Sequence, residues 1–197
     1  MSKSRKRGAA VASSTHTLRI ISGQWRGRRF EFPVEPGLRP TLDRHRETLF
    51  NWLMFDVESA RCLDVFAGSG ALGLEALSRY AKEVVFLEKA ASASRQISLI
   101  LDSLKATGGQ VLQTDSLKWL AQPATQPFDI VFLDPPFGTE LLPETCGLLD
   151  KSGWVKPGAL IYLESENLDI SSIIPESWAI EREKVGKNKQ FFLLKKH

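Results

Sequence analysis

The fold of this chain is decided by residues 62–73, which read CLDVFAGSGALG. Apolar residues lead into a turn that contains Gly68 and Gly70, and a helix-forming segment follows. Glycine lets the backbone turn tightly and approach a ligand closely, and Gly73 lets the helix pack near the strand. The start of the helix offers unpaired N–H groups to a polar or anionic ligand. The stretch therefore predicts a strand, a nucleotide-binding turn and a helix.

Downstream of residue 61 the chain alternates between strand and helix patterns. We expect strands over 61–66, 83–88, 110–113, 128–133 and 158–163, and helices over 71–80, 91–106, 115–121 and 139–150. These strands are mostly apolar without strict alternation, as in a parallel sheet with helices on both faces. Segments 178–185 and 190–195 predict a closing antiparallel hairpin. We predict an α/β, Rossmann-like fold with a seven-stranded, mostly parallel sheet.

Acidic residues stand at the ends of three successive predicted strands, at Asp64, Glu88 and Asp115. Glu88 lies 20 residues beyond Gly68. With an acid at this distance, the G-x-G-x-x-G pattern of residues 68–73 fits a NAD site as well. However, Asp64 would repel a pyrophosphate, whereas a ligand carrying an ammonium and a sulfonium gains from nearby negative charge. Each acid also has a purely structural alternative: Asp64 as a loop acceptor, Glu88 as a surface charge and Asp115 as a helix N-cap.

A second chemical motif is Asp134-Pro135-Pro136-Phe137, which follows the apolar segment 128–133. The Asp134 carboxylate and the Pro135 carbonyl can each accept an N–H from an exocyclic amine, and Phe137 can stack on a planar ring. Fixing the amine in line with a methyl donor accelerates transfer through proximity and orientation. The structural alternative is a Pro-Pro turn after a core strand, with Asp134 capping the turn.

The net charge of +3 conceals a marked asymmetry. Residues 1–46 hold 11 Lys and Arg against 3 Asp and Glu, whereas residues 47–197 hold 15 against 20. Such a split indicates a basic arm that meets a polyanion. We expect a flexible basic tail over 1–17, a basic extension over 18–56 that faces the polyanion and a catalytic domain over 57–197.

The extension has patterns for two strands and a helix. Strands are expected over 18–21 and 28–32, joined through 23–27, and a helix follows, with Thr41 as its N-cap and its end near residue 53. Arginines alternate with aromatic residues here, so they are expected to grip phosphates, and Trp25 either stacks on a nucleotide or packs the hairpin onto the domain.

Composition excludes several other classes of protein. The chain has no apolar run of the ~20 residues that a membrane span needs, and no apolar core follows the basic amino terminus as in a secretory signal. Cys62 and Cys146 are expected to be a buried, reduced pair, typical of a cytoplasmic protein. Three scattered histidines and no close cysteine spacing predict no metal site. Nothing indicates an obligate oligomer, so a monomer is expected.

Beyond these separate motifs, the chain resembles a known family. Residues 64–70 and 134–137 are similar to the first motif and the catalytic motif of class I S-adenosylmethionine-dependent amino-methyltransferases. Residues 20–28, 37–41, 46–53 and 70–79 resemble the bacterial 16S ribosomal RNA guanine-N2 methyltransferase family, and the resemblance covers roughly residues 18–195. It implies methylation of one guanine amine in small-subunit ribosomal RNA, on an assembling subunit.

The resemblance also implies roles for individual residues. S-adenosylmethionine would be bound by Asp64, Phe66, Ala67, Gly68, Gly70, Glu88, Lys89, Asp115 and Ser116. The guanine amine would be held by Asp134, Pro135 and Phe137. RNA would be contacted by Arg19, Trp25, Arg26, Arg28, Arg29, Arg39, Thr41 and Arg46.

Alternatives from other classes remain open at this point. A DNA adenine-N6 methyltransferase would use the same catalytic motif, although it usually needs additional sequence to flip its base. A NAD-dependent oxidoreductase would use the glycine motif alone. A non-catalytic ribosome-assembly factor could keep the fold without the reaction.

Overall fold

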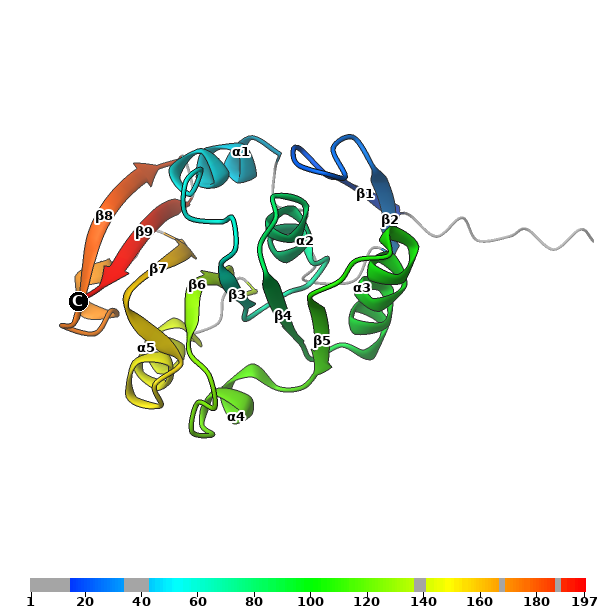
Figure 1. Cartoon of the computed structure of the whole chain (residues 1–197). Helices are drawn as coiled ribbons and strands as arrows, with labels where there is room; N and C mark the ends of the chain where they lie inside the picture. Colours follow the sequence, from blue (N-terminus) through cyan, green and yellow to red (C-terminus); the bar gives the residue numbers. More distant parts are fainter. Residues whose placement is uncertain (1–14, 34–42, 137–140, 167–168, 187–188) are drawn as a thin grey trace, which may run out of the picture.

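The computed structural model describes residues 15–33, 43–136, 141–166, 169–186 and 189–197 (Figure 1). The predicted N-cap Thr41, the predicted site residues Arg39 and Phe137, and most of the predicted tail lie outside the described residues.

A seven-stranded sheet forms the centre of the molecule, in the order β5-β4-β3-β6-β7-β9-β8. Five strands are parallel to one another: β3 (Arg61–Asp64), β4 (Glu83–Glu88), β5 (Gly109–Gln113), β6 (Phe128–Leu133) and β7 (Val155–Ser165). Two antiparallel strands, β8 (Trp178–Val185) and β9 (Gln190–Lys196), complete it. The predicted mostly parallel sheet with a closing hairpin is therefore confirmed.

Helices cover both faces of this sheet (Figure 1). One face carries α1 (Asp43–Trp52), α2 (Ala71–Ser78) and α3 (Ala91–Leu104), and the other carries α4 (Ser116–Leu120) and α5 (Leu141–Lys151). A short 3-10 helix, η1 (Ile170–Ser172), precedes β8.

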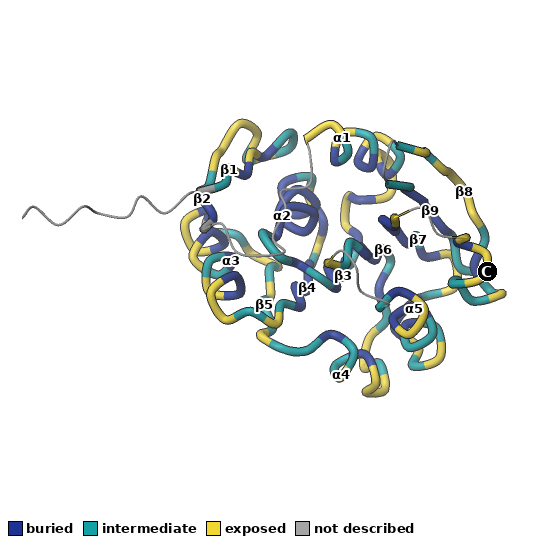
Figure 2. Tube along the Cα trace, turned by 180° about the vertical axis from the view of Figure 1, so that it is seen from behind, coloured by how far each residue is buried: buried dark blue, intermediate teal, exposed yellow. Residues whose placement is uncertain are grey.

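The alternation of side chains along each strand divides the core into two layers. In β4, Val84 and Phe86 pack into the cluster under α1, α2 and α3, whereas Val85 and Leu87 pack into the cluster under α4 and α5. Both sets are buried, which explains why the strands read as continuous apolar runs. Figure 2 shows the central strands and α2 as buried, with β8 more exposed.

A separate two-stranded sheet, β1 (Thr15–Arg19) paired with β2 (Arg29–Pro33), packs beside α2 and α3. The first strand begins and ends earlier than the predicted 18–21. The backbone amides of Ile21 and Ser22 leave the strand pairing because they donate to the carboxylate of Glu75 in α2, at 2.8 and 3.0 Å.

Close packing between α2 and β4 makes Gly73 sensitive to substitution. A Cβ at Gly73 would lie 2.2 Å from Cε1 of Phe86, which is fully buried. We expect Gly73→Ala to lower the free energy of unfolding by about 1–3 kcal/mol, because the ring has to shift within a filled core.

Gly147→Ala is the matched control, since Gly147 lies within α5 and its added Cβ would meet no atom within 4 Å. This control should raise the free energy of unfolding by up to about 1 kcal/mol through helix propensity. Urea titrations of both variants measure the two effects, and equal effects would show that the contact with Phe86 is not limiting.

Candidate active site

The glycine turn joins the end of β3 to the start of α2. Gly68 and Gly70 have φ values of 53° and 72°, which side-chain-bearing residues rarely adopt. The Gly70 amide donates to the Ala67 carbonyl at 2.6 Å, and the buried Asp64 carboxylate accepts from the Gly73 amide at 3.0 Å. One hydrogen bond therefore fastens the strand end to the first turn of the helix.

The second acid, Glu88, ends the neighbouring strand β4. Its carboxylate accepts from the Gly68 amide and from the Ala90 amide, each at 2.7 Å. Glu88 is therefore more than a surface charge, because it holds the glycine turn from the other side. A carboxylate has about four lone-pair sites, so these two contacts leave capacity for a ligand.

The third acid, Asp115, is the N-cap of α4. It accepts from the Lys118 amide at 3.3 Å and pairs with the Lys89 ammonium at 3.0 Å. Next to it, the buried Ser116 hydroxyl donates to the Val65 carbonyl at 2.5 Å and so ties this loop to the end of β3. The structural alternatives for Asp64 and Asp115 are thus observed, and their predicted cofactor roles stay predictions.

The acids at these strand ends interact electrostatically. Burial raises the pKa of Asp64; the hydrogen bond from Gly73 opposes this, the Asp134 and Glu88 carboxylates add to it, and the resulting pKa is about 7. By contrast, the hydrogen bond from Lys89 holds the pKa of Asp115 below its usual value. Negative charge is therefore concentrated around the glycine turn.

Asp134 lies directly beyond the carboxyl end of β6, beside that turn. The Val65 amide donates to the Phe132 carbonyl at 3.1 Å, so the ends of β3 and β6 are joined. Asp134 and Pro135 are both partly exposed. The two motifs that stood out in the sequence thus meet at the carboxyl ends of β3 and β6, as expected for neighbouring parallel strands.

The hairpin residues predicted to contact RNA fall into two groups. Side chains exposed to solvent are those of Arg19, Arg26, Arg28 and Arg29. Trp25 is partly buried and packs against the core cluster, which favours its structural alternative.

Arg46 corrects a prediction, because it lies inside the protein. Its side chain has 0% exposure, and Nη2 donates to the Arg19 carbonyl at 2.7 Å and pairs with Asp43. The guanidinium holds the start of α1 against the hairpin, so it is not on a surface that RNA can reach.

Sequence reasoning missed a polar cluster beside Asp134. The Tyr162 hydroxyl and the Lys189 ammonium donate to the two oxygens of Glu164, at 2.9 and 2.8 Å. Lys189 Nζ is also 3.9 Å from Oδ1 of Asp134. The available signal was an acid two residues after a tyrosine at the end of the last parallel strand.

Among the described residues, no group of three or more His, Cys, Asp and Glu side chains is arranged to hold a metal ion. No helix in the described part of the chain is long and apolar enough to span a membrane. Cys62 and Cys146 are buried and free, as predicted.

Solved structures share this architecture. The Escherichia coli protein yhhF is 45% identical with a TM-score of 0.85, and the match covers 92% of this chain and 99% of that one. The Thermus thermophilus 16S rRNA N2 G1207 methyltransferase, solved with AdoMet and guanosine, is 22% identical with a TM-score of 0.70. That match covers 93% of this chain and 50% of the Thermus chain, and at this identity it shows the fold alone.

Sequence comparison agrees with the resemblance found in the motifs. Ribosomal RNA small subunit methyltransferase D of Escherichia coli K12 is 51% identical over 174 residues, which cover 88% of this chain and 87% of the relative. The model of the family described as conserved hypothetical protein 95 matches residues 18–194, and the chain belongs to this family.

Proposed function

We propose that the protein is an S-adenosylmethionine-dependent methyltransferase that modifies the N2 amine of a guanine in small-subunit ribosomal RNA. The observation that carries this proposal is the position of Asp134 and Pro135 at the end of β6, beside the glycine turn and its acids. The name of the Escherichia coli relative supports ribosomal RNA as the substrate. An enzyme of this kind works in the cytoplasm, where small subunits assemble.

The residues around the turn suit this cofactor. Ribose hydroxyls and an adenine amine are donors, and Glu88 and Asp115 supply acceptors at neighbouring strand ends. Phe66, Ala67, Lys89 and Ser116 complete the proposed contacts. An ammonium and a sulfonium are stabilised by Asp64 and its acidic neighbours, whereas a pyrophosphate would be repelled. When bound, the cofactor supplies a methyl group on a positively charged sulfur.

Asp134 orients the guanine amine for attack. Its carboxylate and the Pro135 carbonyl accept the two N–H groups, so the nitrogen lone pair is directed at the methyl carbon. With S-adenosylmethionine bound, its sulfonium would supply the methyl group to this nitrogen and would keep the electron pair of the S–C bond. The amine proton then becomes acidic and passes to the Asp134 carboxylate and on to water. Phe137 is proposed to stack on the base.

The arginine-rich loop lies far along α2 from this chemistry. Gln24 and Trp25 donate their amides to Ser78 at the end of α2, whereas the glycine turn stands at its start. Eight residues of helix separate the two ends by about 12 Å. RNA that contacts both must extend over more than one nucleotide, which fits a folded RNA on an assembling subunit. Arg39 and Thr41 are proposed to add RNA contacts.

The central test is to map methylated guanines in ribosomal RNA from cells with and without the gene. Loss of one N2-methylguanine from small-subunit RNA is the expected result. Purified protein should also methylate small subunits from the deletion strain and leave duplex DNA unmodified. Activity on duplex DNA alone would establish the adenine-N6 alternative instead.

Removing the Asp134 carboxylate should separate chemistry from cofactor binding. We expect Asp134→Ala to lower kcat on small subunits by at least about 100-fold, because the amine is no longer oriented or deprotonated. Calorimetry with S-adenosylhomocysteine should show binding close to that of the parent. Asp102→Ala, on the exposed side of α3, is the control and should keep full activity. Rescue of a deletion strain's assembly defect by Asp134→Ala would favour the non-catalytic role.

Charge removal in the hairpin loop should weaken RNA binding in a salt-dependent way. The double variant Arg26→Ala/Arg28→Ala should reduce the slope of log affinity against log salt concentration by about 1–2, since two phosphate contacts are lost. Binding of small subunits measured over a series of salt concentrations gives the slope. Arg182→Ala, exposed on the edge strand β8, should leave the slope unchanged.

The negative charge of Asp64 should lower the free energy of unfolding and strengthen cofactor binding. Because its folded pKa of about 7 exceeds the usual value of 3.8, the folded protein binds the extra proton. Its contribution to stability is therefore lost as pH rises from about 4 to about 7. Asp64→Asn keeps an acceptor for Gly73 and should remove this loss.

Without cofactor, Asp64→Asn should be more stable than the parent at about pH 8, by on the order of 1–4 kcal/mol, and about equal at low pH. The same variant should bind S-adenosylmethionine less tightly, because a negative charge is missing. Urea titrations at several pH values and calorimetry measure the two effects. A variant less stable than the parent at high pH would show that the ionised hydrogen bond outweighs burial.

A further inference from the structure

A buried carboxylate holds a lysine beside Asp134 of the candidate active site. Glu164 is 2% exposed, and its two oxygens accept from the Tyr162 hydroxyl at 2.9 Å and from the Lys189 ammonium at 2.8 Å. Lys189 Nζ lies 3.9 Å from Oδ1 of Asp134. The ammonium is therefore shared between two carboxylates, one buried and one at the proposed reaction centre.

Strand pairing fixes the relative positions of these groups. β6 and β7 pair in parallel with Leu133 opposite Leu163, so Asp134 and Glu164 continue from adjacent strands at the same height. Gln190 of β9 pairs with Ser165, which brings Lys189 to the same edge. Three neighbouring strands thus supply the three charges.

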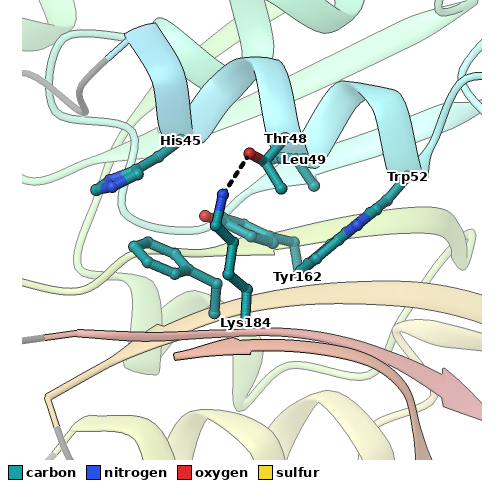
Figure 3. Close-up of a pocket in the computed structure, with 7 residues that line it drawn as sticks. His45, Thr48, Leu49, Trp52, Tyr162 and Lys184 are labelled. Atoms are coloured by element: carbon teal, nitrogen blue, oxygen red, sulfur yellow. Dashed lines mark hydrogen bonds between the residues drawn. The ribbon is translucent and has the colours of Figure 1, made fainter. Parts of the chain in front are cut away.

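Helix α1 covers the buried end of this cluster. Figure 3 shows Tyr162 beneath α1, between His45 and Trp52. The His45 ring packs against Phe191 at 4.4 Å between centroids, and the Lys184 ammonium donates to the Thr48 hydroxyl at 2.9 Å. These contacts fix α1 to β9 and β8, so Tyr162 beneath the helix has little freedom to move.

The two ends of the cluster differ in accessibility. Both oxygens of Glu164 are engaged and the side chain is closed to solvent, whereas the Lys189 side chain is 23% exposed. A ligand at Asp134 can therefore reach Lys189 but not Glu164. An ammonium carries three N–H donors and no acceptor, so it selects an acceptor on that ligand.

Resting on the proposed function, we propose that Lys189 recognises the O6 carbonyl of the target guanine and that Glu164 positions Lys189 for this contact. With the N2 amine at Asp134, the ribose lies toward the N3 side of the base, and O6 is the acceptor on the opposite side, where Lys189 Nζ at 3.9 Å from Asp134 can donate to it. A purine with an amine at position 6 would place a donor, in place of an acceptor, opposite the ammonium donors. Lys189 is therefore a specificity-determining residue, and Glu164 is a positioning residue.

Replacing the base and the lysine together tests the contact. Small subunits are reconstituted with RNA in which the target guanine, once mapped, is replaced by 2-aminopurine, which keeps the N2 amine and lacks O6. Lys189→Met should lower kcat/KM on the guanine subunit by about 10- to 100-fold, the usual size of base discrimination by a specific contact. On the 2-aminopurine subunit, the parent should already be slow and Lys189→Met should add little further loss.

Two further variants distinguish the contact from a general disturbance. Lys189→Met/Glu164→Gln removes both charges, leaves no unpaired buried carboxylate and should reproduce the loss of Lys189→Met. Glu164→Gln alone should reduce the preference for guanine over 2-aminopurine while S-adenosylhomocysteine binding persists. Lys195→Met, toward the other end of β9, is the matched control and should behave as the parent.

Equal losses on both substrates would overturn the O6 contact, because Lys189 would then act only by holding Asp134. An unchanged rate on the guanine subunit would overturn it as well. A parent protein that methylates no small-subunit guanine would overturn the proposed function itself, so the two failures are distinguishable.

Discussion

The hydrogen bond from the Gly73 amide to the buried Asp64 carboxylate is the constraint on which the site depends. It joins the end of β3 to the first turn of α2 and fixes the loop between them. Glu88 holds the same loop from β4, and Ser116 holds it from the loop after β5. The loop that forms the proposed cofactor site is thus positioned from three strand ends before any ligand arrives, which is the arrangement expected of a preorganised site.

Two kinds of charge are kept apart by this architecture. Acidic groups gather at the carboxyl ends of the parallel strands, whereas exposed arginines occupy the hairpin beside α2. A positively charged cofactor and a negatively charged RNA can therefore approach the same enzyme without competing for one surface. Lys89 and Lys189 are exceptions, since each ammonium lies against carboxylates at these strand ends. The Lys189 ammonium, held by Glu164 beside Asp134, is suited to donating to an acceptor on a neutral base.

Much of the fold and part of the site could be predicted from the sequence. Glycine spacing, apolar strands and the motif at Asp134 are local patterns, and parallel strands bring such local motifs to one edge. What escaped prediction depends on contacts between distant segments. Arg46 was predicted to contact RNA at the surface, whereas its guanidinium is buried and donates to the carbonyl of Arg19, 27 residues earlier in the chain. Likewise, Glu164 and Lys189 are 25 residues apart and meet only because β9 pairs with β7.

The end of β1 and the course of the hairpin escaped prediction for the same reason. Glu75 lies within α2, has no exposure to solvent and accepts from Ile21, Ser22 and Arg79. Removal of the residues before 57 would remove Ile21 and Ser22. The Glu75 carboxylate, which is buried in the full chain, would then be exposed to water. The amino-terminal extension is thus no detachable module, and fusion or domain-exchange designs should carry residues 15–56 together with the sheet that follows.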